Sequence, residues 1–400
     1  MENRIDPEEL AALEKEHMSG GMARRNVLIL RGEGARLFDA SGKEYLDLAG
    51  ANGWAALGHA HPAVTRAIRE QAERLVCYTE NGFNDQRALW MAELSALLER
   101  EIGADERGPL TRIHPCNSGT EAVEGGIKAA RWFTGRPGVV AAKRGFHGRT
   151  LGSLSATWKP HYREPFQPLV PGYTHVPYND AAALEKAVDD RTAAVLLEVV
   201  QGEGGVYPAT EEFLDTARRI CRERGALLLY DEVQTGFGRT GKWFAACHYE
   251  AGPDLLLLGK ALGGGIPMGA VAWRRDLGTF QAGRHASTFG GNPLACAASR
   301  AALRVMEEED LPGRAARLGE KALAAFREER PPLVRQVRGR GLMIGLELKT
   351  KVQPYIQALM ERGIWTLPAG PTVLRLLPPL VIAQEDLERA VRTILEVLHG

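Results

Sequence analysis

Lys260 directly follows an apolar run, in the segment Leu255-Leu-Leu-Leu-Gly-Lys260, and glycines occupy positions 263–265. A lysine at the end of a buried strand loses much of its hydration, which lowers its pKa and makes the neutral, nucleophilic amine available near neutral pH. The three glycines would let backbone or a ligand approach closely. Taken alone, the segment is equally compatible with a lysine that simply emerges at a strand end.

A second apolar run, Leu227–Tyr230, leads directly into Asp231. Open α/β sheets bind their ligands at the carboxyl ends of their strands. An aspartate at that position could cap a helix, bind a metal, or keep the pyridinium nitrogen of a cofactor protonated. If the strands before Asp231 and Lys260 are neighbours, the two side chains share one crevice.

Three further segments combine glycine with hydroxyl, aromatic or basic side chains. Cys116–Ala122 precedes a helical pattern, and a helix start favours an anion such as phosphate, although an ordinary serine cap would look the same. Phe146–Thr150 offers a ring and, in Arg149, a partner for a carboxylate. His147 has no evident partner and is interpreted as non-catalytic. His285–Pro293 is a hydroxyl-rich turn that could contact a phosphate.

Alternating strands and helices must position these segments. Glu121–Arg131 and Glu211–Arg224 have helical periodicity, and short apolar runs between such patterns indicate strands buried on both faces. Those runs are Val139–Ala142, Ala193–Val199, Ala226–Tyr230, Leu255–Leu258 and Ala270–Trp273. The pattern predicts an α/β fold with a mostly parallel sheet and helices on both faces.

The C-terminal third has a different pattern. It predicts helices at Ala295–Glu308, Leu318–Glu329 and Glu385–Leu398, and strands at Gly341–Leu348 and Val373–Leu377. We therefore expect a large domain formed by residues 55–295, and a smaller α+β domain formed by residues 1–54 together with 296–400.

Composition excludes several classes of protein. The formal net charge is zero, which argues against bulk attraction to nucleic acid or membranes. The five cysteines are scattered without metal-binding spacing, as is typical of reduced thiols in a cytosolic protein. Residues 1–20 lack the apolar core of a secretory signal, and no apolar run is long enough to cross a bilayer. We expect a cytoplasmic protein with no metal site.

With these segments in this order, the chain resembles class III (subgroup II) aminotransferases, which belong to the fold-type I pyridoxal-phosphate enzymes. The resemblance extends from Leu57–Pro62 to Val373–Leu380. Within that class the chain is most similar to acetylornithine aminotransferases and to the branch that acts on lysine or ornithine attached to LysW, an acidic amino-group carrier protein. The segments Gly339–Glu347 and Tyr162–Val170 support that subfamily.

The resemblance implies pyridoxal 5'-phosphate as the cofactor and assigns roles around it. Lys260 would be the Schiff-base lysine and would move a proton between the substrate Cα and the cofactor C4′, while Asp231 would hold the pyridinium proton. Thr288 would come from a second subunit, which implies a homodimer. The residues implied to contact the cofactor's phosphate, ring or phenolic oxygen are Ser118, Gly119, Thr120, Phe146, Glu232, Val233, Gln234 and Thr288.

The resemblance also implies a substrate site. Arg149 would bind the donor's α-carboxylate or the side-chain carboxylate of glutamate, and Arg375 would bind glutamate's α-carboxylate. Glu203 would neutralise Arg375 while an amine donor is bound, since an unpaired buried arginine is costly. Ser287 and Asn52 would lie near the substrate. Asn52 stands where relatives often carry Tyr or Ile, so it leaves the donor open.

The leading interpretation is a transaminase that moves an amino group between glutamate or 2-oxoglutarate and the terminal amine or semialdehyde of an N-blocked lysine or ornithine, in lysine or arginine biosynthesis. Ornithine or 4-aminobutyrate aminotransferases, and an aminomutase or decarboxylase on the same scaffold, are the alternatives. The Glu203–Arg375 switch argues against the last two, because it is useful only when two donors alternate. A cofactor-binding regulator would need a DNA-binding module, and little chain precedes the first strand-like run, Val27–Leu30.

An acidic carrier protein should meet local positive charge even on a chain of zero net charge. The turn at residues 146–150 is called the Phe146 turn. The candidates are Lys143 and Arg144, just before this turn, and Lys159 and Arg163, which follow it. These side chains would surround the entrance of the pocket. An ordinary solvated surface is an equally weighted alternative.

Overall fold

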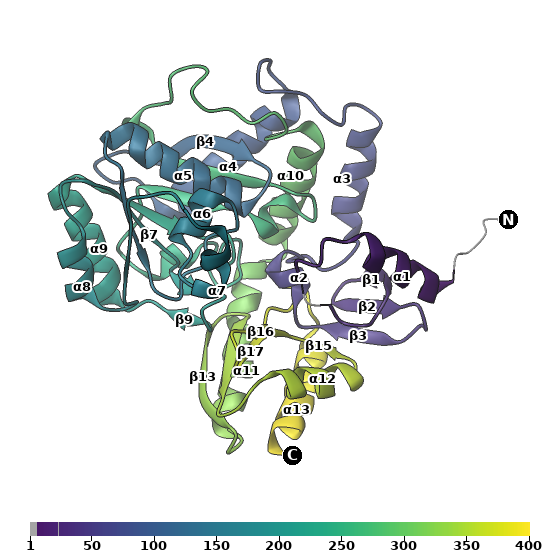
Figure 1. Ribbon diagram of the computed structural model, residues 1–400. Helices are drawn as coiled ribbons and strands as arrows, with labels where there is room; N and C mark the ends of the chain where they lie inside the picture. The colour runs from purple at the N-terminus through teal and green to yellow at the C-terminus, as the bar shows by residue number, and fades with distance from the viewer. Residues whose placement is uncertain (1–5, 23) are drawn as a thin grey trace.

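A seven-stranded sheet forms the centre of the structure, a computed structural model that describes residues 6–22 and 24–400 (Figure 1). In spatial order its strands are β4 (Leu110–Cys116), β12 (Gly269–Arg274), β11 (Leu255–Leu258), β10 (Leu227–Asp231), β7 (Thr192–Leu197), β5 (Gly138–Ala142) and β6 (Tyr173–Val176). Only β12 runs antiparallel to its neighbours in this sheet. The predicted α/β class and mostly parallel sheet are therefore confirmed.

Both faces of the sheet are covered, which explains the continuous apolar runs. Leu255 and Leu257 of β11 belong to one buried cluster, with the apolar side chains of helix α5 (Gly119–Thr134). Leu256 and Leu258 belong to a second cluster on the other face, with α4 (Asp85–Ile102), α9 (Glu211–Arg224) and α10 (Pro293–Glu308). Alternate residues of one strand thus serve two cores.

Helix α5 packs especially close to the sheet. A Cβ at Gly126 would lie 2.5 Å from Leu257 Cδ2, so only glycine lets the helix approach this strand without a shift. The helix begins after its N-cap Ser118 and ends at Gly135, which has a left-handed φ of 69°. The start of α5 is consequently fixed above the carboxyl end of β4.

Smaller sheets lie beside the central one. The first contains β1 (Ile29–Glu33), β2 (Arg36–Asp39), β3 (Glu44–Asp47) and β15 (Ile364–Trp365); the second contains β13 (Val334–Arg340), β14 (Met343–Leu348), β17 (Val373–Leu376) and β16 (Leu367–Ala369). Because β15 pairs with β3, segments from both ends of the chain form one sheet. The division into a large domain of residues 55–295 and a smaller domain of residues 1–54 and 296–400 stays a prediction.

Shorter elements and the remaining helices complete the fold. They are α1 (Pro7–His17), α2 (Gly50–Gly53), α3 (Pro62–Ala72), α6 (Leu151–Ala156), α7 (Pro160–Arg163), α8 (Ala181–Ala187), α11 (Leu311–Glu328), α12 (Gln353–Glu361), α13 (Gln384–His399), β8 (Val200–Gln201), β9 (Tyr207–Pro208) and the 3-10 turn η3 (Lys260–Gly263). None of the helices within the described residues is long and apolar enough to cross a membrane.

Two predicted strands differ from the structure by two residues at one end. In the run Ala193–Val199 the strand ends at Leu197, because Glu198 leaves the sheet and its carboxylate accepts the Phe146 N–H. The run Gly341–Leu348 becomes a strand only at Met343, because β13 ends at Arg340 and the chain turns there. Strands β4 and β6 were not predicted.

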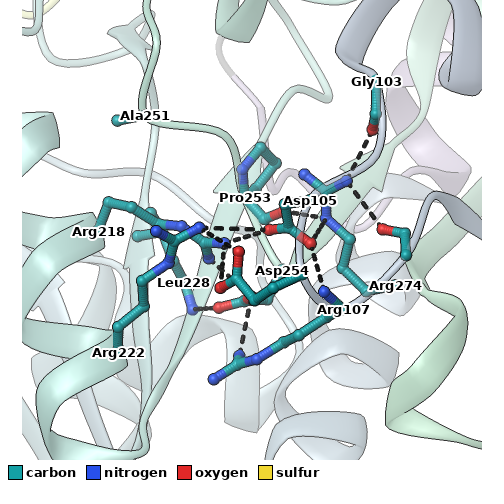
Figure 2. A network of polar contacts seen from close by, with 12 residues as sticks. Gly103, Asp105, Arg107, Arg218, Arg222, Leu228, Ala251, Pro253, Asp254 and Arg274 are labelled. Carbon is teal, nitrogen blue, oxygen red and sulfur yellow. Dashed lines mark hydrogen bonds and ion pairs between the residues drawn. The ribbon is translucent and has the colours of Figure 1, made fainter.

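A network of charged residues anchors the amino ends of the strands (Figure 2). Asp254 is fully buried just before β11, and its Oδ1 accepts hydrogen bonds from Arg107 (2.9 Å) and Arg218 (2.7 Å). Its Oδ2 accepts the Leu228 N–H of β10 at 2.8 Å. Lys260 lies beyond the opposite end of β11, so this network is separate from the residues that could do chemistry.

Candidate active site

The strands that carry Asp231 and Lys260 are neighbours. β10 and β11 pair in parallel with Asp231 opposite Leu257, and the Glu232 N–H donates to the Leu257 carbonyl at 2.9 Å. Asp231 therefore ends β10 at the same edge of the sheet where Lys260 follows β11. This geometry meets the condition under which the sequence predicted a shared crevice.

Lys260 lies at a close approach between the β11 turn and helix α5. It has a positive φ of 46°, and a Cβ at the preceding Gly259 would lie 3.3 Å from Gly119 Cα. Burial lowers the pKa of the Lys260 ammonium; the nearby Glu203 and Asp231 carboxylates oppose that shift, and Arg375 reinforces it. The neutral amine is thus more accessible than in a lysine exposed to water.

Asp231 is buried and held by two donors. Its Oδ2 lies 2.8 Å from Nδ1 of His147, and its Oδ1 accepts the Val233 N–H at 3.1 Å. Burial lowers the pKa of His147, but the hydrogen bond and charge of Asp231, with the charge of Glu198, raise it above its ordinary value. The interpretation of His147 as a histidine without a partner was therefore wrong: only the fold, by placing the Phe146 turn beside β10, reveals the pair.

Glu198 is a functional candidate that the sequence reasoning missed. It directly follows β7, much as Asp231 ends β10, and its carboxylate accepts the N–H groups of Phe146 and Gly202, each at 2.9 Å. Burial raises the pKa of Glu198 to about 7, against the opposing charge of His147. The signal that could have found it is the same as for Asp231, an acid immediately after an apolar strand.

Glu203 and Arg375 form the ion pair that the family resemblance implied. Arg375 lies in β17 with its side chain 2% exposed, and its Nη1 is 2.6 Å from Glu203 Oε1. The same Nη1 donates to Gln234 Oε1 at 3.0 Å. Burial raises the pKa of Glu203, but the charge and hydrogen bond of Arg375 outweigh this effect, so the pKa lies below its ordinary value and the carboxylate stays ionised. The Glu203 side chain is 32% exposed, whereas the arginine that it pairs with is buried.

The start of α5 offers unused donors. Ser118 is an ordinary helix cap: its Oγ accepts the Glu121 N–H at 3.3 Å and donates to Glu121 Oε2 at 3.0 Å. Among the described residues, the backbone N–H groups of Gly119 and Thr120 have no acceptor. A Cβ at Gly119 would lie 2.6 Å from Val233 Cγ1, so glycine lets Val233, two residues after Asp231, pack against the helix start. These N–H groups suit an anion.

The Phe146 turn presents an arginine without an acidic partner. The guanidinium carbon of Arg149 lies 5.5 Å from the Phe146 ring centre and 4.1 Å from that of Tyr162. No ion pair involves Arg149 in the described part of the chain. An exposed guanidinium held on aromatic faces is available to a substrate carboxylate.

Glu232 is buried, and its carboxylate is used within the fold. It accepts the N–H groups of Ala245 (3.0 Å) and Ala246 (2.7 Å) and the Thr235 hydroxyl. Burial raises its pKa. The cofactor contact that the resemblance implied for Glu232 stays a prediction.

Ser287 and Thr288 lie on a loop before α10. Ser287 Oγ accepts hydrogen bonds from Asn117 Nδ2 (3.2 Å) and the Gly290 N–H (2.9 Å), which places it near the start of α5. Thr288 is exposed and lines a cavity of about 320 Å³. Across the described residues, no hydrogen bond joins Thr288 to Lys260 or Asp231, and the contact with a second subunit's cofactor that the resemblance implied for Thr288 stays a prediction.

Asn52 lies in an unusual left-handed turn. Gly50, Ala51, Asn52 and Gly53 have φ values of 50°, 48°, 61° and 83°. A Cβ at Gly50 would lie 2.4 Å from the Leu377 carbonyl oxygen, and one at Gly53 would lie 3.8 Å from Gln234 Cγ. Gly53, the residue after Asn52, therefore lies beside Gln234, which accepts a hydrogen bond from Arg375, while Asn52 itself is exposed.

The residues present fit pyridoxal phosphate. Unpaired N–H groups at a helix start suit its phosphate, a histidine-bound carboxylate suits its ring nitrogen, and a buried amine suits its aldehyde. The described residues contain no group of three or more His, Cys, Asp or Glu side chains arranged for a metal ion.

Known proteins are similar over the whole length. An acetylornithine aminotransferase of Methanopyrus kandleri is 46% identical, with 99% of this chain and 100% of that protein covered. A [LysW]-aminoadipate semialdehyde transaminase of Deinococcus radiodurans is 45% identical, with 100% and 92% covered.

Solved structures give the same result. An ornithine aminotransferase of Toxoplasma gondii superposes with a TM-score of 0.91 at 34% identity, covering 99% of this chain and 96% of that one. An acetylornithine aminotransferase of Elizabethkingia anophelis superposes with a TM-score of 0.86 at 35% identity, covering 98% and 99%. A family model, Aminotransferase class-III, matches residues 19–398. The chain belongs to the class III aminotransferases and is a pyridoxal-phosphate-dependent enzyme.

Proposed function

We propose that this aminotransferase moves an amino group between glutamate or 2-oxoglutarate and the terminal amine or semialdehyde of an N-blocked lysine or ornithine. The observation that carries the proposal is the Glu203–Arg375 pair, 2.6 Å long and near Lys260. An arginine that is neutralised by a movable acid suits a pocket in which a dicarboxylate and a longer amine donor alternate. The names of the relatives from M. kandleri and D. radiodurans agree with such donors.

The chain's residues would divide the work as follows. Bound pyridoxal phosphate supplies a ring that accepts the electron pair left when the substrate carbon that bears the amino group loses its proton; this carbon is the terminal one in the amine donor and Cα in glutamate. Lys260 Nζ would take that proton and deliver it to C4′ of the cofactor. Asp231, oriented by His147, keeps the ring nitrogen protonated. The N–H groups of Gly119 and Thr120 hold the phosphate.

Three residues would select the substrate. Arg149 binds the α-carboxylate of the amine donor or the side-chain carboxylate of glutamate, because its guanidinium has no acidic partner in the described chain. Arg375 binds the α-carboxylate of glutamate once Glu203 moves aside. With an amine donor, Glu203 stays in place, so that the buried Arg375 is never left unpaired.

A donor panel tests this proposal. Acetylornithine, acetyl-lysine, a carrier-linked lysine, free ornithine and 4-aminobutyrate would each be mixed with the holoenzyme, and the decay of the cofactor's visible absorbance would be followed in a single turnover. The N-blocked donors should react at least about 10-fold more efficiently than the free ones, a difference of about 1.4 kcal/mol. Equal or better reaction of free ornithine or 4-aminobutyrate would replace the proposed donor class.

The proposed partner is an acidic carrier protein, and unpaired basic side chains support it. Within the described residues, none of Lys143, Arg144, Lys159 and Arg163 forms an ion pair. Lys143 Nζ lies 5.3 Å from the Trp158 ring centre, and Lys159 Nζ lies 5.1 Å from that of Tyr162. The Tyr162 ring also contacts the Arg149 guanidinium, so the positive charge of Lys159 lies close to the proposed substrate arginine.

Salt dependence separates a carrier-linked donor from a free one. The kcat/KM for the carrier-linked donor should fall between low and physiological ionic strength, since charge steering is screened beyond about 8 Å. Acetylornithine should barely respond. A double variant, Lys143→Glu with Arg144→Glu, should weaken only the carrier-linked reaction, while Lys321→Glu, on the distant α11, serves as the control. Equal responses of both donors would remove the carrier from the proposal.

A homodimer is proposed because the family resemblance implies that Thr288 comes from a second subunit, and within the described residues Thr288 has no hydrogen bond to Lys260 or Asp231. Phe289, next to it, is an exposed aromatic side chain, and Phe83 is fully exposed. Large exposed apolar side chains are typical of a surface that a second copy covers. Light scattering should give a mass about twice that of the chain, and a monomer that is fully active would contradict the shared site.

A further inference from the structure

One carboxylate ties the start of α5 to the turn that carries Arg149. Glu124 lies one helical turn after Thr120 on α5. Its Oε1 accepts hydrogen bonds from Thr150 Oγ1 at 2.6 Å, from the Gly152 N–H at 2.9 Å and from the Ser153 N–H at 3.1 Å. These donors belong to the end of the Phe146 turn and to the first turn of α6.

Glu124 replaces the usual cap of α6. Thr150 is the N-cap residue of this helix but makes no side-chain cap of its own. The carboxylate of a different helix accepts the N–H groups at N2 and N3 instead, where negative charge is favourable. A Cβ at Gly152 would lie 2.3 Å from Glu124 Oε2, so glycine is needed for this contact. The residue after Arg149 is therefore held against α5.

The carboxylate also anchors a cluster of hydroxyl groups. Because an ionised carboxylate only accepts, the Thr150 hydroxyl must donate its proton to Glu124. The Thr120 Oγ1 lies 2.6 Å from Ser153 Oγ and 2.9 Å from Thr150 Oγ1, and it accepts the Thr150 N–H at 3.4 Å. Ser153 Oγ in turn donates to the Thr150 carbonyl at 3.1 Å. Through Thr150, Glu124 therefore fixes the position of the Thr120 hydroxyl at the start of α5.

We propose that Glu124 is a positioning residue that sets affinity at two places: for the cofactor's phosphate, through the Thr120 hydroxyl, and for the substrate's carboxylate, through the Arg149 turn. The inference rests on the proposed roles of Thr120 and Arg149. Glu124 would act through these neighbours. Its Oε1 alone accepts three hydrogen bonds from Thr150, Gly152 and Ser153.

Paired substitutions at Glu124 test this inference. Since all three donors use a single oxygen, glutamine can keep every bond through its own Oε1, whereas alanine keeps none. Glu124→Ala should raise the dissociation constant for pyridoxal phosphate, and the KM for glutamate, by about 10-fold or more. The kcat at saturation should stay within about threefold, because no reacting group is lost. Glu124→Gln should remain within about threefold of the wild type in all three quantities.

Two measurements exclude a merely structural effect. The dissociation constant for pyridoxal, which lacks the phosphate, should change little in Glu124→Ala, and the Tm of the apo protein reports stability separately. Glu320→Ala is the matched control, since Glu320 is an exposed glutamate on α11 with no polar contact in the described chain. A lower Tm with unchanged pyridoxal-phosphate binding and unchanged KM would overturn the inference. The inference would also be overturned if Glu124→Gln weakened pyridoxal-phosphate binding and raised the KM for glutamate as much as Glu124→Ala does.

A variant outside the carboxylate guards against a chain that does not fold. Thr150→Val removes only the hydroxyl between Glu124 and Thr120, while Thr150→Ser keeps it. If Thr150→Val binds pyridoxal phosphate more weakly than the wild type while Thr150→Ser binds it normally, the Thr150 hydroxyl links Glu124 to Thr120 as proposed. Equal binding by the two variants refutes that link. A wild-type chain that fails to bind pyridoxal phosphate would instead refute the proposed function itself.

Discussion

The sharpest consequence of the proposed mechanism concerns Glu203. Replacing it with glutamine keeps the shape of the side chain but removes the negative charge 2.6 Å from Arg375. During the half-reaction with glutamate, the substrate's own carboxylate pairs with Arg375, so this half-reaction should be retained. During the half-reaction with an N-blocked amine donor, nothing else neutralises the buried guanidinium. The two half-reactions should therefore separate.

The size of the separation follows from the contact. Arg375 is 2% exposed and has Gln234 as its remaining hydrogen-bond partner, so water does not replace the lost carboxylate. A hydrogen bond to a charged group contributes about 1.5–3 kcal/mol, and each 1.4 kcal/mol corresponds to about a factor of ten. We expect kcat/KM for the amine donor to fall about 10- to 100-fold, while kcat/KM for glutamate changes less than about threefold.

Stopped-flow absorbance of each half-reaction measures both constants on the same enzyme preparation. Glu347→Gln is the matched control, because Glu347 also pairs with an arginine, Arg338, but in the β13–β14 hairpin. It should leave both half-reactions unchanged. Equal losses for glutamate and the amine donor in Glu203→Gln would refute the switch and make Glu203 a structural acid.

Four other outcomes are expected. Lys260→Ala should abolish turnover and the cofactor's characteristic absorbance, and turnover near the wild-type rate would refute the site. Asp231→Asn should retain cofactor binding but slow proton abstraction by orders of magnitude, and unchanged half-reaction rates would assign the ring nitrogen to another acid. Burial raises the folded pKa of Glu198 to about 7 from 4.5, so its stabilising contribution is complete below pH 4.5 and is lost as the pH rises through 7. In denaturant titrations, the free energy of unfolding of Glu198→Gln should therefore gain about 2 kcal/mol relative to the wild type between pH 5 and pH 8. Parallel pH dependences of the two free energies would contradict the shift. Asp254→Asn should lower the free energy of unfolding by about 3–5 kcal/mol with kcat/KM unchanged, and a loss of activity without loss of stability would contradict the separation of network and site.

The sequence was informative wherever burial leaves a strong local signal. The leucines of β11 and the run before Asp231 indicated strands covered on both faces, and the structure has them as neighbours. Charged residues directly after such strands break the apolar pattern, which is why Lys260 and Asp231 could be identified. The strand β4 was not predicted, because His114 and Pro115 interrupt its apolar character.

Contacts between distant segments could not be predicted in the same way. His147 and Asp231 are 84 positions apart, and nothing near either residue indicates that their side chains are 2.8 Å apart. The hydrogen bonds of Glu124 to the start of α6 depend on how closely α5 lies to that turn, and a helical pattern carries no information about this distance. The Glu203–Arg375 pair was predicted only through the family resemblance.

The left-handed turn at residues 50–53 limits which side chains position 52 can accept. Asn52 has a φ of 61°, a conformation that asparagine adopts more readily than any β-branched residue. Introducing isoleucine there would add strain of about 1–2 kcal/mol before any substrate contact is made. A single replacement at this position therefore starts from a deficit, and a successful change of specificity would combine it with a rebuilt Gly50–Gly53 backbone. Libraries that vary the whole turn should yield new specificities more often than libraries that vary Asn52 alone.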